Sequence, residues 1–180
     1  MATWIIYCFI ILSIFCIFSI IKLFNRGEKE YAKSAVSTYA TFSVIFICVL
    51  LFSIKIPSYI IFLTMLTIFI ACFVGHYLSF YTKSNTFDRY LHGFGSFSFS
   101  LFFYCIVDNY INTGSSKIFQ SIFIFLLGNT LGVFFELIEA MHDKSNPIKS
   151  QKGLMDTNTD MTFNLIGSVL AGLFAYIWLL

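Results

Sequence analysis

Six stretches of the sequence are almost continuously apolar, and short polar segments separate them. An α-helix rises about 1.5 Å per residue, so about 20 apolar residues cross the hydrocarbon core of a bilayer. The pattern therefore predicts an all-α fold, a polytopic transmembrane helix bundle with about six spans. The predicted helices cover residues 3–24, 36–54, 59–82, 90–107, 118–141 and 160–180.

The polar segments between these stretches leave no room for a long hydrophilic region. We therefore expect residues 1–180 to form a single integral membrane domain with short connections. The composition agrees, because 58% of the residues are hydrophobic, 20% are aromatic and only 11% are charged, which lies outside the range of soluble domains.

The charge of the chain narrows the classes of partner. A net charge of +2 without a basic run argues against nucleic-acid binding. We expect the partner to be a membrane lipid or an amphipathic small molecule, and the oligomeric state stays open.

The Lys and Arg residues are divided unequally between alternate connections. Nine lie in or beside the first, third and fifth connections, whereas only Lys55 and Lys117 lie on the other side. Cytoplasmic loops keep positive charge during insertion. We therefore expect a multi-pass protein of the cell membrane with the odd-numbered connections in the cytoplasm and both termini outside.

Acidic, imidazole and amide side chains gather near this predicted cytoplasmic face. A charge inside a membrane helix costs roughly 2.5 to 3.5 kcal/mol on insertion scales, so such residues usually face the bundle interior and serve a function. Steps of three and four residues place the members of each group on one side of their helix. The groups are Asp88 and His92 in the fourth predicted helix region, Glu136, Glu139 and His142 in the fifth, and Asp156, Asp160 and Asn164 in the sixth. Asp108 and Asp143, by contrast, are expected to be solvated loop charges.

Carboxylates combined with imidazoles suit a hard or borderline divalent cation. Helix bundles build metal sites from Glu-x-x-His pairs, and Glu139 and His142 have that spacing. The candidate metal ligands are Glu136, Glu139, His142, Asp156 and Asp160. An alternative is an inert ion-pair network with Arg89, Lys144 or Lys152 that only fixes the helix register.

The same polar groups carry a resemblance to known membrane proteins. The chain resembles predicted inner-membrane proteins of the YjdF type and, more loosely, the VanZ-like family, over about residues 85–175. The motifs are Asp88-x-x-x-His92, Gly132-x-x-x-Glu136-x-x-Glu139 and Asp156-Thr157-x-x-Asp160-Met161-x-x-Asn164-x-x-Gly167. The resemblance implies a small polytopic membrane protein without an established reaction, and VanZ-like members are associated with glycopeptide-antibiotic resistance.

Our leading hypothesis is an enzyme-like site that acts on a lipid-linked or amphipathic substrate at the cytoplasmic leaflet. In it a carboxylate holds a divalent metal, or the groups share protons, and His92 acts as acid or base because its pKa lies nearest neutrality. The alternatives are a small proton-coupled transporter and a non-catalytic accessory subunit of a membrane complex. The sequence alone does not decide whether the protein is an enzyme. The candidate catalytic residues are His92, Asp88, Glu136, Glu139, Asp156, Asp160 and Asn164.

Overall fold

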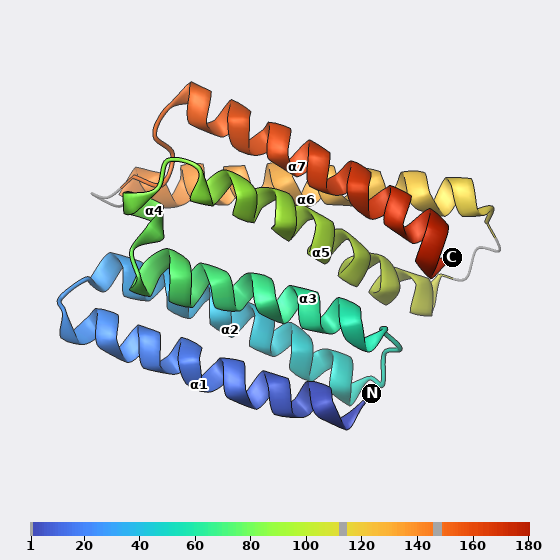
Figure 1. The fold of residues 1–180 in the computed structure, drawn as a ribbon, viewed down its shortest axis with the longest axis horizontal. Helices are drawn as coiled ribbons and strands as arrows, with labels where there is room; N and C mark the ends of the chain where they lie inside the picture. The colour runs from blue at the N-terminus through green and yellow to red at the C-terminus, as the bar shows by residue number, and fades with distance from the viewer. Residues whose placement is uncertain (1, 112–114, 146–148) are drawn as a thin grey trace. The chain divides into compact units, whose positions relative to one another are not determined.

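A computed structural model describes residues 2–111, 115–145 and 149–180. These residues form helices joined by short connections, and no strand occurs among them. Six of the helical segments are long and apolar enough to cross a membrane, as the ribbon in Figure 1 illustrates. The predicted all-α fold with about six spans is therefore confirmed.

The chain divides into two compact units, Met1–Asp88 and Arg89–Leu180. The prediction of a single domain over residues 1–180 stays a prediction. The first unit contains α1 (Thr3–Asn25), α2 (Lys29–Leu51), α3 (Ser58–Phe69), the π-helical segment η1 (Ile70–Tyr77) and the short α4 (Phe80–Lys83). The second contains nearly all of α5 (Phe87–Tyr110), then α6 (Lys117–Ser145), α7 (Leu154–Phe174) and the π-helical η2 (Ala175–Leu179).

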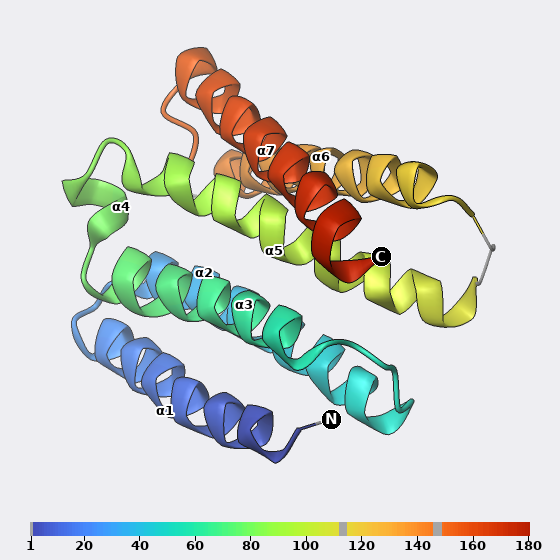
Figure 2. The ribbon, with the colours of Figure 1, turned by 45° about the vertical axis from the view of Figure 1, so that its right-hand side comes forward.

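In the first unit, α1 packs against α2, α3 and η1. Figures 1 and 2 both show α1, α2 and α3 as neighbouring helices, with α2 running roughly antiparallel to the other two. Gly27 makes the first reversal possible, because its φ of 77° lies in the left-handed region that side chains disfavour. There the N–H groups of Gly27 and Glu28 donate to the carbonyl oxygens of Phe24 and Leu23, which satisfies the end of α1.

In the second unit, side chains near the helix starts satisfy backbone groups that have no partner within the helix. Ser116 Oγ accepts a hydrogen bond from the N–H of Phe119 at the start of α6. Asp156 Oδ2, in the first turn of α7, accepts one from the N–H of Lys152. Gly153, with φ 121°, turns the chain into α7. These contacts fix where α6 and α7 begin.

The helix bounds differ from the predicted ones in a consistent way. The helix predicted over 36–54 spans Lys29–Leu51, and the one predicted over 160–180 begins at Leu154. Hydropathy marks only the part of a helix that suits the bilayer core, whereas intrahelical hydrogen bonds continue into polar residues. As a result, most of the polar candidates lie within regular helix.

Two further expectations were wrong. The segment predicted as one helix over 59–82 ends at Tyr77, and Ser79 follows with a left-handed φ of 63° before α4. Asp108 was expected in a loop but lies in α5, where it accepts a hydrogen bond from Tyr104 Oη at 3.5 Å. The helix continues past the apolar run because an acidic group near a helix end can still reach polar partners.

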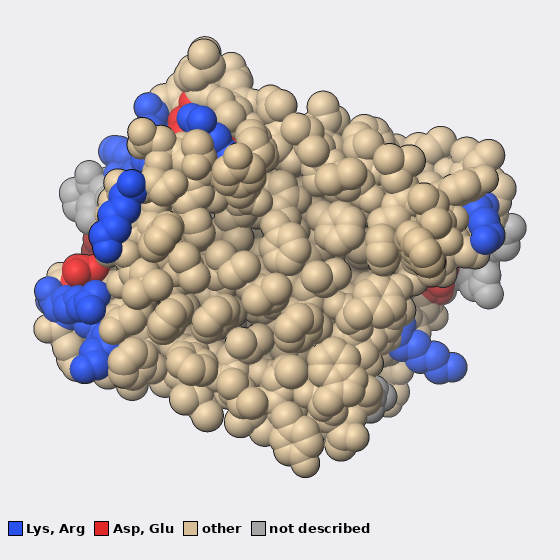
Figure 3. Space-filling model, viewed as in Figure 1, with Lys and Arg blue, Asp and Glu red and all other residues tan. Residues whose placement is uncertain are grey.

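The surfaces of both units suit a lipid environment. The Lys, Arg, Asp and Glu side chains visible in Figure 3 lie near helix ends, and the surface between those ends carries no charge in that view. On α6 and α7 the exposed side chains include large apolar ones such as Phe134, Leu137 and Leu170. The burial of Glu136, Asp160 and Asn164 inside the second unit separates these polar side chains from this apolar surface.

Candidate functional site

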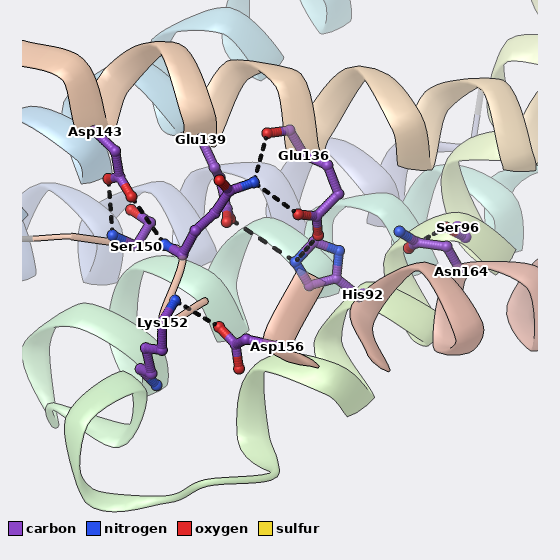
Figure 4. Close-up of polar contacts among 10 residues, drawn as sticks. His92, Ser96, Glu136, Glu139, Asp143, Ser150, Lys152, Asp156 and Asn164 are labelled. Atoms are coloured by element: carbon purple, nitrogen blue, oxygen red, sulfur yellow. Dashed lines mark hydrogen bonds and ion pairs between the residues drawn. The ribbon is translucent and has the colours of Figure 1, made fainter. Parts of the chain in front are cut away.

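The start of α5 and the end of α6 bring one imidazole and two carboxylates together. His92 Nε2 lies 3.8 Å from Glu136 Oε1 and 3.8 Å from Glu139 Oε1 (Figure 4). One ligand atom from each of the three residues lies within 4.8 Å of the other two. Both 3.8 Å separations are longer than a hydrogen bond. The three groups thus face one another at ion-pair distance.

Burial differs sharply among the three side chains. The side chains of His92 and Glu136 are only 10% and 6% exposed, whereas that of Glu139 is 28% exposed. Glu136 Oε1 has no hydrogen-bond partner among the described residues. An ionised carboxylate held this way is costly unless a cation or a proton compensates it.

The first turns of α7 add Asp160 to this site. Asp160 is buried, and one of its carboxylate oxygens lies within 4.8 Å of a ring nitrogen of His92. Asp88, the residue at which the first unit ends, occupies the first turn of α5, four residues before His92 on the same helix. His92 therefore stands between carboxylates from α6 and α7.

Glycines set the close approach of the three helices. A Cβ added to Gly167 on α7 would lie 2.0 Å from the carbonyl oxygen of Gly93 on α5. A Cβ added to Gly132 on α6 would lie 2.7 Å from Asn164 Cγ, and one added to Gly128 would lie 2.4 Å from Ser168 Oγ. Small residues at these positions permit such contact between membrane helices.

Asn164 lies one turn deeper than Asp160 on α7. Its Oδ1 accepts a hydrogen bond of 2.7 Å from Ser96 Oγ on α5, which is one turn beyond His92 (Figure 4). Both residues are buried. The polar site thus has a second layer of neutral hydrogen-bonding groups below the charged one.

The connection between α6 and α7 folds back over the site. Gln151 Nε2 donates to Glu136 Oε2 at 3.1 Å and to the Glu136 carbonyl oxygen at 3.0 Å. Asp143 holds this connection, because its two carboxylate oxygens accept the N–H groups of Ser150 and Gln151 at 2.8 and 2.9 Å. The expectation that Asp143 is a solvated loop charge was therefore wrong, since its carboxylate is buried and occupied by backbone donors.

Two predicted metal ligands, His142 and Asp156, fall outside the groups of side chains that could share an ion among the described residues. His142 is in the last turn of α6, and Asp156 is in the first turn of α7, where it accepts the Lys152 N–H. Among the described residues, neither belongs to a group of three metal-binding side chains. Each step of three residues turns a helix by about 60° short of a full circle, so two steps carry His142 about 120° away from Glu136.

A family model described as "Predicted membrane protein (DUF2238)" matches residues 5–180. The chain belongs to the DUF2238 family of predicted membrane proteins. This is the YjdF-like family, so the predicted resemblance is confirmed and includes the first two helices as well. The looser similarity to VanZ-like proteins is not shown. Membership of the DUF2238 family and the six apolar helices support a multi-pass membrane protein.

The DUF2238 chain also matches a curated relative. Over 107 residues it is 36% identical to an "Uncharacterized protein" of Thermotoga maritima, a match that covers 56% of this chain and 53% of the relative. The chain thus spans about half the length of the curated relative that it matches. No solved structure matches the chain.

Sequence reasoning missed two contributors to this site. Ser96 carried no signal of its own, although it lies at the same four-residue step that links Asp88 to His92. Gln151 belongs to a connection, and nothing in its sequence neighbourhood predicts that it reaches Glu136. Only the fold places these two side chains at the site.

Proposed function

We propose that the protein is a metal-dependent membrane enzyme whose divalent cation is held by His92, Glu136 and Glu139. The observation that carries this proposal is the burial of the Glu136 carboxylate. The side chain is only 6% exposed, and its Oε1 has no hydrogen-bond donor among the described residues. A cation between the three groups would compensate that charge.

The spacing of the ligand atoms suits a shared ion. Two atoms that are each about 2.1 Å from one ion lie about 3 to 4 Å apart, depending on the angle between the bonds. Both separations from His92 Nε2 are 3.8 Å, within this range. One imidazole and two carboxylates suit a borderline divalent ion such as Zn²⁺, Mn²⁺ or Fe²⁺ better than Ca²⁺, which takes oxygen ligands.

The other groups have distinct roles in this proposal. The bound ion would lower the pKa of a coordinated water and so provide a nucleophile near neutral pH. Asp160, close to His92, is placed to accept a proton, and Gln151 orients the second oxygen of Glu136. Where no metal is bound, His92 between these carboxylates retains the capacity for acid or base chemistry.

The surroundings of the site support an amphipathic class of substrate. Glu139, the more exposed ligand, lies on α6 next to Ile138, which is 59% exposed on an apolar surface suited to lipid. A substrate with a polar group and an apolar tail can approach along such a surface. We therefore propose a lipid-linked or amphipathic substrate taken from the leaflet that we predict to be cytoplasmic.

The test is the metal content of the purified protein. We expect about one equivalent of a transition metal in the wild type and a loss of most of it in Glu136→Gln, which keeps the shape but removes the charge. Glu28→Gln, in the connection between α1 and α2, is the matched control and is expected to retain the metal. Metal near zero in the wild type after purification and reloading would remove the metal-dependent function.

A second candidate, proton-coupled transport, is favoured by one observation on α5. His92, Ser96, Ser100, Tyr104 and Asp108 follow one another at four-residue steps along the whole helix. Ser96, Ser100 and Tyr104 are buried, and Tyr104 Oη donates to Gln120 Oε1 on α6.

Proton flux distinguishes this candidate from the enzyme. If the stripe conducts protons, vesicles containing the protein should acidify under an imposed potential faster than protein-free vesicles, and Tyr104→Phe should slow them. Thr130→Val, an exposed position on α6, is the control. Equal rates with and without protein would exclude transport of protons by this route.

A further inference from the structure

Among the described residues, only one end of the Asn164 amide group has a hydrogen-bond partner between the packed helices. Asn164 is only 3% exposed, and its Oδ1 accepts the 2.7 Å hydrogen bond from Ser96 Oγ. Its Nδ2 has no hydrogen-bond partner among the described residues. A role in holding α5 to α7 accounts for the oxygen of this amide and leaves the two N–H donors without a purpose.

These donors lie beside the charged layer of the site. A Cβ on Gly132 would lie 2.7 Å from Asn164 Nδ2, and Gly132 is one helical turn from Glu136 on α6. Figure 4 shows the amide nitrogen on the side of Asn164 that is turned toward His92 and Glu136. The absence of a side chain at Gly132 is what leaves room for the amide at this depth.

The orientation of the amide has a physical reason. Asp160 is one turn from Asn164 along α7, and Glu136 is one turn along α6 from Gly132, which the amide faces. The positive end of the amide dipole is therefore favoured on the side of these carboxylates. Ser96 then donates to the oxygen end. A buried N–H group without an acceptor costs free energy in a membrane, where no bulk water can replace the partner. An oxygen atom supplied by a ligand would remove that cost.

We infer that Asn164 Nδ2 donates a hydrogen bond to an oxygen of the bound substrate, and that the substrate therefore carries a carbonyl or phosphoryl oxygen. This inference rests on the proposed function, because the same ligand must reach the cation at His92, Glu136 and Glu139. The cation and the Asn164 amide select for an acceptor oxygen on the polar group, while the tail stays in the bilayer. Asn164 is then a specificity-determining residue.

The experiment measures the affinity of simple amphiphiles for the metal-loaded protein in lipid nanodiscs. The probes are dodecylphosphonate, which offers phosphoryl oxygens, 2-tridecanone, which offers a carbonyl oxygen, and dodecyltrimethylammonium, which offers no acceptor. We expect the wild type to bind at least one oxygen-bearing probe more tightly than the ammonium probe. Asn164→Asp, which replaces the donor by an acceptor of the same shape, should weaken that binding about tenfold or more and should not weaken binding of the ammonium probe.

Two controls make the result specific. Asn129→Asp changes another asparagine of a membrane helix, one whose Nδ2 already donates to the Phe125 carbonyl oxygen, and should leave probe affinity unchanged. Ser96→Ala removes the hydrogen bond that orients the Asn164 amide and should weaken the binding of oxygen-bearing probes severalfold. It is the alternative test variant if Asn164→Asp does not fold.

The outcomes separate this inference from the proposed function. Normal metal content with equal probe affinities in the wild type and the folded Asn164 or Ser96 variants overturns the inference alone. A wild type that prefers neither oxygen-bearing probe overturns it as well. If the protein contains no metal but probe binding still depends on Asn164, the metal-dependent function is overturned. The inference that the substrate offers an acceptor oxygen to Asn164 then stands.

Discussion

At the scale of single residues, the site depends on glycines, whose lack of a side chain lets the helices approach closely. Gly167 lies against the backbone of Gly93. Backbone atoms cannot rotate away as a side chain can, so a methyl group at Gly167 would require the helices to move. Gly132 instead faces the side chain of Asn164, which has some freedom to shift. The cost of adding a methyl group should therefore differ between these two positions.

We predict that Gly167→Ala is the more damaging of the two substitutions. Its Cβ would stand 2.0 Å from a backbone oxygen, so α5 and α7 must separate. Overpacking of this kind costs about 1 to 3 kcal/mol, occasionally more. Thermal unfolding in detergent should show a clear loss of stability, accompanied by a loss of bound metal because the displaced α5 carries His92 away from Glu136 and Glu139.

The matched control for this substitution adds a methyl group on the lipid-facing side of the same helix. Val169→Ile, at a residue that is 42% exposed, should change stability little. If Gly167→Ala retained both stability and metal, the close contact between α5 and α7 would not be what holds the site together.

Residues also mark the limit of what the sequence could predict about the site. The rarity of acidic and imidazole groups in membrane helices was enough to select His92, Glu136 and Asp160. It could not distinguish Glu139, which faces His92, from His142, because steps of three residues drift around the helix by an amount that matters only once the neighbouring helix is in place. Ser96 and Gln151 are common polar residues, and only tertiary contacts make them partners of Asn164 and Glu136.

At the scale of helices, hydropathy predicted how many there are better than where they end. Apolar runs located all six long helices because a membrane offers the backbone few alternatives to internal hydrogen bonds. The ends depend on local groups such as Gly27 and Ser116 that satisfy the terminal N–H and carbonyl groups. The π-helical segments at Ile70–Tyr77 and Ala175–Leu179 had no signal in the apolar pattern.

The helix α5 carries polar residues that also serve in helix packing. Its polar residues would be unfavourable on a surface facing lipid, yet Ser96, Ser98 and Ser100 are all buried. Their small side chains allow α6 and α7 to approach, and Ser100 Cβ would lie 3.1 Å from a Cβ on Gly128. The polar face of α5 that contains Ser96 and Ser100 is therefore also a packing face of this helix.

At the scale of the whole molecule, the orientation of the chain in the membrane decides which leaflet the site serves. The excess of Lys and Arg in alternate connections predicts that the connections after α1, before α5 and after α6 are cytoplasmic, with both termini outside. The carboxylates and His92 lie on helix ends that adjoin these connections. A cytoplasmic-leaflet substrate follows only if this orientation is right.

Cysteine labelling tests the orientation with the full chain. In a variant whose five cysteines are replaced, Phe52→Cys lies between α2 and α3, and Asn85→Cys lies between α4 and α5; both positions are exposed and neither changes the Lys and Arg pattern. A membrane-impermeant maleimide added to intact cells should label Phe52→Cys and reach Asn85→Cys only after permeabilisation. The opposite pattern would move the site to the outer leaflet, where the arrangement of His92, Glu136 and Glu139 would be unchanged but the substrate would have to come from the lipids or amphiphiles outside the cell.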